Sequence, residues 1–567
     1  MPDNRKIFLF AAVSIILLRW VFPEADPPWF KDLGDFHDET WWAENARRKI
    51  LINTWFWDQY AGALAAGPLS ALWHYLTFKI FGISFFSLRL IALVPASLTG
   101  LILLKSSHFH KEKQGWIILL ILTSAGWFAY SRIGYIESML LFILISTIAL
   151  FKIGSKSGSV AGVILLCGGM LFKGSFIYLA LPLLVWSTFQ PGLTIKHKTF
   201  RLIGFGALSI LFWLIYYYPH QELFLPYSTQ IKSQYYSATQ LFNPGGWLAR
   251  LVWLPSKETF SAPFTGWILI LLFIKWVKNG IPPLQHRFSF LLILCLLFAL
   301  PSDFSDRRLV FFFILPALCL GEADVKWKKS FSGSFILNFL LLLPMLQAMS
   351  ERALRPDDLL SYYVLPAIIL ASILFLLMKL ESHYASNLAI SPLSLVALAI
   401  SAHSLIFHSS ARWADALNIA FILLYSVQLV IFISLVAGLV IKPIFNESHV
   451  LAGITILQLA VCIQLLLSST FTVQKTASGL AEEFKAPVKV QANPAALELL
   501  FLSKASNSMY PKDAQNVYAR NGVFMYAADY VMTKQDSINM FRLKTAQMQG
   551  LVPSNKGHRL KFIFTSQ

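Results

Sequence analysis

Long apolar segments restrict what this chain can fold into. They run for about 15–25 residues, the length that a helix needs to cross a lipid bilayer. Hydrophobic residues fill 56% of the 567 positions, and charged residues fill only 13%. We therefore predict a mainly α-helical, polytopic membrane protein with about 13–15 spans. The expected spans lie at about residues 7–23, 84–104, 115–130, 135–152, 159–172, 175–189, 202–218, 264–280, 287–300, 309–321, 333–349, 361–379, 389–408, 416–441 and 449–470.

The distribution of charge orients these spans in the membrane. With the N-terminus taken as cytoplasmic, the Lys-rich connections fall on the cytoplasmic side, as the positive-inside rule predicts. The acidic residues, including a cluster at residues 38–44, then face the exoplasmic side, which is the periplasm in a Gram-negative bacterium. The net charge of +18 follows from this topology and does not indicate nucleic-acid binding. We expect a multi-pass protein embedded in the lipid bilayer.

Two long loops and a soluble tail interrupt the pattern of spans. The first exoplasmic loop covers residues 23–82 and the second covers 219–263. We predict a transmembrane domain over 1–470 and a small exoplasmic α/β domain of ordinary soluble composition over 471–567. Within this tail, residue periodicity predicts helices at 480–484 and 495–504, and strands at 488–490, 523–531 and 560–564.

An acidic cluster follows the first span, with Asp38, Glu39 and Glu44 inside seven residues. Carboxylates are costly near hydrocarbon, so this density favours a functional role. A simpler interpretation is that Asp38 caps a surface helix over about residues 39–49. Glu39 and Glu44 would then be solvated or paired with Arg47, which contributes little stability. The tryptophans and apolar residues of the segment recur at helical spacing, which predicts an amphipathic helix at the membrane interface.

The segment Asp38-Glu39-Thr40-x-x-Ala43-Glu44-x-x-Arg47 resembles the first exoplasmic loop of GT-C membrane glycosyltransferases. The resemblance is strongest to the aminoarabinose transferases that modify lipid A, and weaker to the protein O-mannosyltransferases. Further blocks continue it in consistent order over roughly residues 5–320: Gly67-Pro68-Leu69 with Trp73 and Phe81-Gly82, Phe86-Ser87-Leu88-Arg89, Arg132 to Glu137 with Met139-Leu140, Gly168 to Gly174, and Phe304-Ser305-x-Arg307-Arg308-Leu309.

The resemblance implies an inverting transfer of a sugar from a polyprenyl-phosphate carrier. An acceptor attacks the anomeric carbon and the lipid phosphate leaves, with Asp38 as the general base or as the carboxylate that orients the acceptor. The other implied catalytic acids are Glu39 and Glu137, supported by Glu44 and Arg47. Cations are expected beside the leaving phosphate, because negative charge develops there. The candidates for this role are Lys173, Arg307, Arg308, Arg89 and Arg132.

The sequence leaves the sugar, the acceptor and any metal open. Ala66-Gly67-Pro68 stands where lipid A enzymes often carry a lysine, and three phenylalanines at 311–313 stand where a tyrosine is common. The acceptor is therefore lipid A or lipopolysaccharide, a polysaccharide, or a protein. Carboxylates suit a divalent cation, but the sequence assigns neither a metal nor another cofactor. No metal-site spacing is shown by His37, His74, His403 and His408, which are expected at the interface or in the core.

The remaining site residues have simpler interpretations too. Glu137 begins an apolar run, where the helix dipole stabilises an acid, and Lys173 is compatible with an anchoring role. Arg307 and Arg308 lie on the side that the positive-inside rule disfavours, which favours a functional role. The alternative functions are a lipid-linked glycan ligase or polymerase, and a transporter of lipid-linked glycans. A transporter is expected to show internal repeats, and the sequence shows none.

Overall fold

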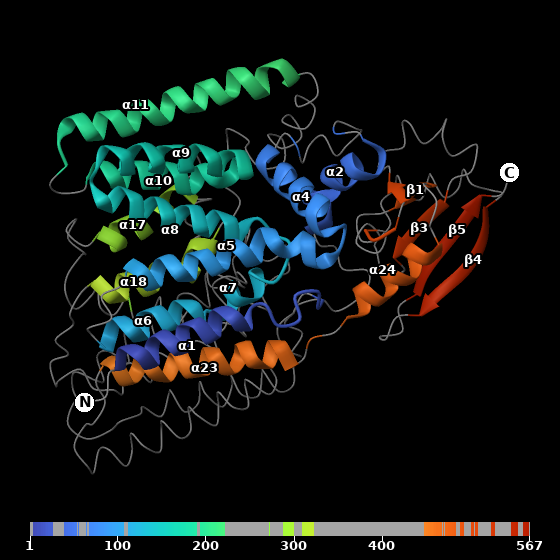
Figure 1. Ribbon diagram of the computed structural model, residues 1–567, viewed down its shortest axis with the longest axis horizontal. Helices are drawn as coiled ribbons and strands as arrows, with labels where there is room; N and C mark the ends of the chain where they lie inside the picture. Colours follow the sequence, from blue (N-terminus) through green and yellow to red (C-terminus); the bar gives the residue numbers. More distant parts are fainter. Residues whose placement is uncertain are drawn as a thin grey trace, which may run out of the picture.

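The computed structural model places a bundle of helices beside a small β-sheet (Figure 1). It describes residues 4–26, 39–53, 55, 64, 67–106, 112–189, 193–221, 272, 287–299, 309–322, 447–467, 469, 471–483, 488–492, 501–503, 505–507, 523–527, 546–553 and 559–565. Several predicted elements lie outside these residues, entirely or almost so, namely the spans at 264–280, 333–349, 361–379, 389–408 and 416–441, the second loop at 219–263 and the helix at 495–504.

The other predicted spans coincide with helices. These are α1 (Asn4–Leu18), α5 (Phe85–Ser106), α6 (Glu112–Leu122), α7 (Ala125–Tyr130), α8 (Glu137–Ile153), α9 (Lys156–Phe172), α10 (Ile177–Thr188), α11 (Ile195–Phe212), α17 (Arg287–Ala299), α18 (Leu315–Glu322) and α23 (Glu447–Leu467). Short turns extend or precede some of them, namely the π-helical η3 (Trp213–Tyr217) and the 3₁₀ turns η2 (Gly174–Phe176), η4 (Tyr218–His220) and η7 (Val310–Phe313). The mainly α-helical fold class is therefore confirmed for the bundle.

Two helices in the described ranges are long and apolar enough to cross a bilayer, Phe85–Lys105 and Ile195–His220. Other apolar helices are shorter, because turns break the predicted runs. The run at 115–130, for example, is divided into α6 and α7 at Thr123 and Ser124. The described part of the chain therefore holds fewer full-length spans than the about 13–15 that the sequence predicts.

The turn between α8 and α9 brings the start of α8 and the end of α9 to the same end of the bundle. α8 ends at Gly154 in the left-handed conformation that favours glycine. The Ser155 hydroxyl then accepts a hydrogen bond from the Gly158 N–H at 3.0 Å and caps α9. This tight turn makes α8 and α9 antiparallel neighbours of equal length, 17 residues each. The chain after α9 therefore returns to the level at which α8 began.

The hydrophobic core lies around α5, α8 and α9, with α6, α7 and α10 packed beside them. Large side chains such as Trp127, Phe151 and Trp186 are fully buried there. α11 runs along one edge of the bundle (Figure 1), and the continuous helical segment Ile195–His220 that it begins is mostly exposed. A helix that is apolar around its surface and exposed in this way suits contact with lipid.

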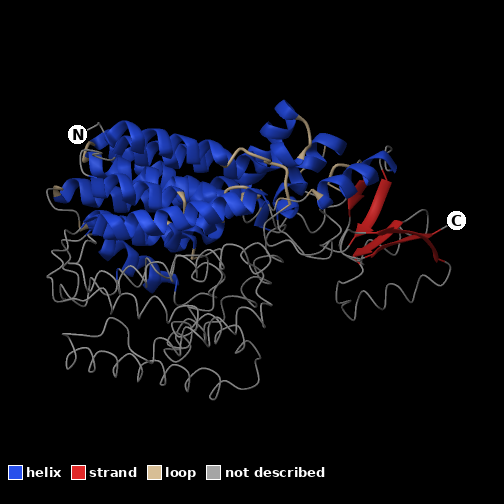
Figure 2. Ribbon diagram, turned by 90° about the horizontal axis from the view of Figure 1, so that it is seen from below, coloured by secondary structure: helices blue, strands red, loops and turns tan. Residues whose placement is uncertain are grey.

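The tail contains a five-stranded mixed sheet at the end of the molecule opposite the start of α1 (Figures 1 and 2). In the order β2-β1-β3-β5-β4, β1 is parallel to β2 and β3, and β5 is antiparallel to β3 and β4. β1, β3 and β5 coincide with predicted strands, and the predicted helix at 480–484 falls at the end of α24. The tail elements are α24 (Thr472–Glu483), β1 (Val488–Ala492), β2 (Ala505–Asn507), β3 (Val523–Ala527), β4 (Ala546–Pro553) and β5 (Arg559–Thr565).

Two helices of the first loop lie between the bundle and the sheet (Figure 1). α4 (Pro68–Phe81) has proline in its first turn, where the missing N–H is no loss. α2 (Glu39–Ile52) begins where the acidic cluster predicts a helix, and it packs against α4. The predicted amphipathic surface character of α2 is wrong, because Glu44 and Arg47 on its polar face are buried. These charges bind one another and the tail instead of water.

Candidate functional site

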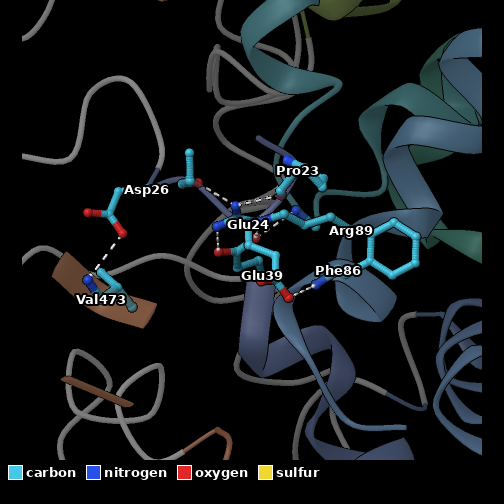
Figure 3. Close-up of polar contacts among 9 residues, drawn as sticks. Pro23, Glu24, Asp26, Glu39, Phe86, Arg89 and Val473 are labelled. Carbon is cyan, nitrogen blue, oxygen red and sulfur yellow. Dashed lines mark hydrogen bonds and ion pairs between the residues drawn. The ribbon is translucent and has the colours of Figure 1, made fainter. Parts of the chain in front are cut away.

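Glu39, the first residue of α2, accepts hydrogen bonds on both carboxylate oxygens. Arg89 Nη2 donates to Oε1 at 2.9 Å, and Arg89 Nε donates to Oε2 at 3.1 Å. The backbone N–H of Gly134 donates to the same Oε2 at 2.7 Å. The side chains of Arg89 and Glu39 are 1% and 2% exposed. The guanidinium fork matches the two carboxylate oxygens, which makes the ion pair bidentate and fixes its geometry (Figure 3).

Gly134 is where the loop between α7 and α8 meets Glu39. A Cβ atom at this position would lie 3.0 Å from Leu88 Cγ and 3.1 Å from Glu39 Oε2. A side chain at this position would therefore require Leu88 or Glu39 to shift by a few tenths of an ångström. The block from Arg132 to Glu137 thus contributes backbone as well as side chains to the site.

Arg89 also binds the segment that follows α1. Its Nη1 donates to the carbonyl of Pro23 at 3.0 Å and to the carbonyl of Ala25. Glu24, between them, accepts a hydrogen bond from the Phe86 N–H at 3.2 Å, in the first turn of α5 (Figure 3). Every nitrogen of the Arg89 guanidinium therefore donates to a protein acceptor. The structure brings Arg89 to the acidic cluster, but as the partner of Glu39.

Glu137, the second predicted acid, forms an ion pair with Lys173. Lys173 Nζ lies 2.5 Å from Glu137 Oε1 and 5.5 Å from the centre of the Trp42 ring. The antiparallel packing of α8 and α9 creates this pair, because Glu137 opens α8 and Lys173 follows α9 directly. The Glu137 side chain is 2% exposed and that of Lys173 is 14% exposed. The ammonium thus combines a carboxylate partner, a contact with an aromatic face and partial access to solvent.

Glu44 and Arg47, predicted as supporting residues, pair one turn apart on α2. Arg47 Nη1 donates to both Glu44 oxygens, at 2.9 and 3.1 Å, and Arg48 Nε donates to Oε1 at 3.2 Å. The other Arg47 nitrogens donate to the carbonyls of Phe501 and Ser503, at 2.8 and 2.5 Å. This pair therefore joins the first loop to the tail, which the sequence alone does not indicate.

Arg132 lies in the loop between α7 and α8, on the side of the segment after α1. Its Nη2 donates to the carbonyls of Val21 and Phe22, both at 3.1 Å. Its Nε has no partner among the residues that the structure describes. Burial and, to a smaller extent, the neighbouring charge of Arg89 lower the pKa of Arg132 to about 10, with Cys462 opposing the shift. Arg132 is therefore close enough to Arg89, the partner of Glu39, for the two predicted cations to repel one another.

Two buried polar residues near the site are absent from the predicted set. Arg19 is fully buried, and its guanidinium lies 4.5 Å from the centre of the Trp127 ring. His74 of α4 stacks on Phe78, and neither ring nitrogen has a partner within the described ranges. Burial lowers the pKa of His74 to about 3, against the opposing charge of Glu39, so this imidazole is neutral at ordinary pH. In the sequence, Arg19 and His74 each interrupt an apolar segment, and this is the signal that could have identified them as candidate site residues.

Three predicted site residues, Asp38, Arg307 and Arg308, lie outside the described residues. In the described part of the chain, no group of three or more His, Cys, Asp or Glu side chains is arranged to hold a metal ion. The site that is described consists of two ion pairs, the buried Glu39–Arg89 pair at the start of α2 and the partly buried Glu137–Lys173 pair beside it. Its chemistry combines carboxylates with one partly accessible ammonium.

Two crystal structures of ArnT from Cupriavidus metallidurans are similar to this chain over nearly its full length. The structure bound to undecaprenyl phosphate matches with a TM-score of 0.56 and 14% identity, over 98% of this chain and 98% of ArnT. The structure in the apo state matches with a TM-score of 0.53 and 12% identity, over 100% of this chain and 99% of ArnT. The chain has the fold of ArnT. A scan against protein-family models gives no match, and neither does a search of curated protein sequences.

The ArnT fold confirms the resemblance to GT-C lipid A aminoarabinose transferases at the level of structure. The match extends over both the helical bundle and the tail. At 14% identity, the likeness to ArnT shows the fold and leaves the reaction of this chain to its own residues.

Proposed function

We propose that this protein is an inverting glycosyltransferase that moves a sugar from a polyprenyl-phosphate carrier to an acceptor on the exoplasmic side of the bacterial inner membrane. The acceptor is lipid A or lipopolysaccharide, a polysaccharide, or a protein. Support comes from the ArnT fold, since one of the matching ArnT structures is bound to undecaprenyl phosphate. Within this chain, the proposal rests on the contacts and the partial exposure of Lys173.

Lys173 has the properties expected of a ligand for a leaving phosphate. An ammonium group has three N–H donors, and within the described residues one hydrogen bond of Lys173 is present, to Glu137 at 2.5 Å. The side chain is 14% exposed, in contrast to the buried Glu137. A phosphate that gains negative charge in the transition state is stabilised by a cation that is already in place. Glu137 orients that cation, and Arg307 and Arg308 are the further candidates for the same phosphate.

The proposed reaction forms one bond and breaks another at the anomeric carbon. The acceptor oxygen attacks from the face opposite the lipid phosphate, and the carbon–oxygen bond to the phosphate breaks with its electron pair on oxygen. Asp38 accepts the proton when the acceptor is a hydroxyl, or orients the acceptor when it is already an anion. Glu39 is better suited to positioning α2 than to catalysis, because both of its oxygens are engaged by Arg89 and Gly134.

The decisive experiment offers the purified protein labelled polyprenyl-phosphate sugars together with membrane extract. We expect sugar transfer by the natural protein and a loss of about 10²–10⁴-fold in Asp38→Asn. Glu482→Gln, an exposed acid of α24, is the matched control and retains transfer. Full transfer by Asp38→Asn contradicts the role of Asp38.

Sidedness and function class have separate tests. A reporter fused after Gln567 is expected to give an exoplasmic signal, and a cytoplasmic signal contradicts the proposed location of the site. Movement of a lipid-linked glycan across the membrane, without transfer from any donor, indicates a transporter instead. Joining of preassembled glycans indicates a ligase or polymerase.

A further inference from the structure

The tail is docked onto the first loop through a buried aromatic ring. Phe501 is 1% exposed. Its ring lies between Phe78 of α4, with centroids 5.7 Å apart, and Phe85 of α5, with centroids 5.5 Å apart. The tail residue is thus part of the packing that joins α4 to α5, and α4 in turn packs against α2.

Arg47 fixes the same tail segment through its backbone. Arg47 Nε donates to the Phe501 carbonyl at 2.8 Å and Arg47 Nη2 donates to the Ser503 carbonyl at 2.5 Å. Arg47 Nη1 meanwhile holds Glu44, and all of these groups are buried. A buried guanidinium that binds a carboxylate and two carbonyls is costly to unpair. Residues 501–503 and α2 therefore form one unit.

A second contact holds the tail to the segment after α1. Asp26 Oδ1 accepts a hydrogen bond from the Val473 N–H at 3.1 Å, in the first turn of α24 (Figure 3). Gln474 Nε2 donates to Glu24 Oε2 at 2.5 Å. The same segment supplies the Pro23 and Ala25 carbonyls to Arg89, which holds Glu39. The tail thus contacts α2 itself, and it also contacts the segment whose carbonyls bind Arg89, the partner of Glu39 at the start of α2.

We propose that the tail positions α2 for the transfer reaction, with Phe501 and Arg47 as positioning residues. This inference rests on the proposed glycosyltransferase function. α2 has 14 residues, and helices of about this length are marginal in isolation, so tertiary contacts determine where its N-terminus lies. Asp38 directly precedes that N-terminus. A displacement of reacting groups by about 1 Å costs about 10²-fold in rate, so loosening α2 lowers kcat.

The first test compares two buried phenylalanines of equal burial. Phe501→Leu is expected to lower kcat by about tenfold or more, with the KM for the polyprenyl-phosphate sugar unchanged within about twofold. Phe151→Leu is the control, because Phe151 is fully buried but lies 14 positions along α8 from Glu137, about 21 Å away. Equal kcat values in the two variants overturn the proposal.

The second test uses a conservative rescue at Arg47. Arg47→Lys keeps a charge for Glu44 and one carbonyl, so it is expected to retain more kcat than Arg47→Met. Wild-type kcat in both variants overturns the proposal.

A third measurement does not depend on the reaction. Hydrogen exchange of the amides of residues 39–52 is expected to accelerate in Phe501→Leu and to stay unchanged in Phe151→Leu. Equal exchange in both overturns the docking proposal. If the natural protein transfers no sugar while the exchange result is as expected, the proposed function fails and the docking of the tail stands.

Discussion

The Glu39–Arg89 and Glu137–Lys173 ion pairs differ in how completely the protein binds their charges. In the Glu39–Arg89 pair, two hydrogen bonds of 2.9 and 3.1 Å join the side chains, and Gly134 adds a third at 2.7 Å. In the Glu137–Lys173 pair, one contact of 2.5 Å joins a buried acid to a lysine that is 14% exposed. In the first pair, Glu39 and Arg89 are fully engaged by protein groups and have no freedom to bind a ligand. In the second pair, Lys173 is able to bind one.

This difference separates scaffold from chemistry within one cluster. A bidentate arginine pair has a fixed fork geometry, whereas a lysine is a point charge that exchanges partners readily. Breaking a buried pair by removing one partner leaves an uncompensated charge, which is strongly destabilising. The comparison therefore predicts that variants of the first pair lose stability, whereas a variant that removes Lys173 loses activity in addition to the stability that the unpaired, buried Glu137 costs.

The largest effect is expected from Arg89→Met, which leaves Glu39 buried without its guanidinium. The free energy of unfolding is expected to fall by about 3–5 kcal/mol. The measurement is reversible unfolding in detergent, monitored by a tertiary-structure probe. Lys79→Met, an exposed cation on α4, is the control and is expected to change stability by less than about 0.5 kcal/mol. Equal stability of the two variants would show that the Glu39–Arg89 pair is not a scaffold.

The next largest effect is expected from Lys173→Met, which lowers the rate of sugar transfer. Loss of one preorganised donor to the leaving phosphate lowers kcat by about 10²–10³-fold. The matched control is Lys152→Met, which removes an exposed lysine near the other end of α8. Transfer rates are measured with the same labelled donor for both variants. A Lys173→Met protein with the kcat of its control would place the phosphate elsewhere.

The smallest effect concerns the acid sensitivity of the scaffold. Burial lowers the pKa of His74 to about 3, with Glu39 opposing the shift, whereas an unfolded histidine titrates at about 6.5. Between these values the unfolded chain binds a proton that the native protein does not, so native stability falls as the pH is lowered. The expected slope is at most about 1.4 kcal/mol per pH unit for this group. His74→Leu is expected to flatten it, and parallel stability curves for variant and natural protein contradict the assignment.

Much of the fold could be predicted from the sequence, because helix positions depend on local patterns. The apolar run at 84–104 predicts α5, observed at Phe85–Ser106, and the acidic cluster predicts a helix start at Glu39. The β1 and β3 strands follow from short runs of β-branched and aromatic residues. Full spans are harder to predict, since one turn at Thr123 divides an apolar run that looks continuous.

The sequence named candidate site residues more readily than it named their partners. Glu39, Glu137, Arg89 and Lys173 form two ion pairs, and their roles in a reaction stay a prediction. Which acid meets which base depends on tertiary contacts between residues 50 and 36 positions apart, and no periodicity encodes those. The contact of Arg47 with Phe501 is more remote still, at 454 positions, and no local pattern in the sequence indicates it.

The hydrogen bond between Asp26 and Val473 joins residues 447 positions apart in the chain. A nascent chain grows by about 5–20 residues per second, so about 20–90 s of synthesis separate the two partners. During that time α2 exists without the groups that complete its burial, although the helices next to it in the sequence are already made. The ion pairs Glu39–Arg89 and Glu137–Lys173 need only residues made early, whereas the contacts that dock the tail onto α2 require nearly the whole chain to be synthesised.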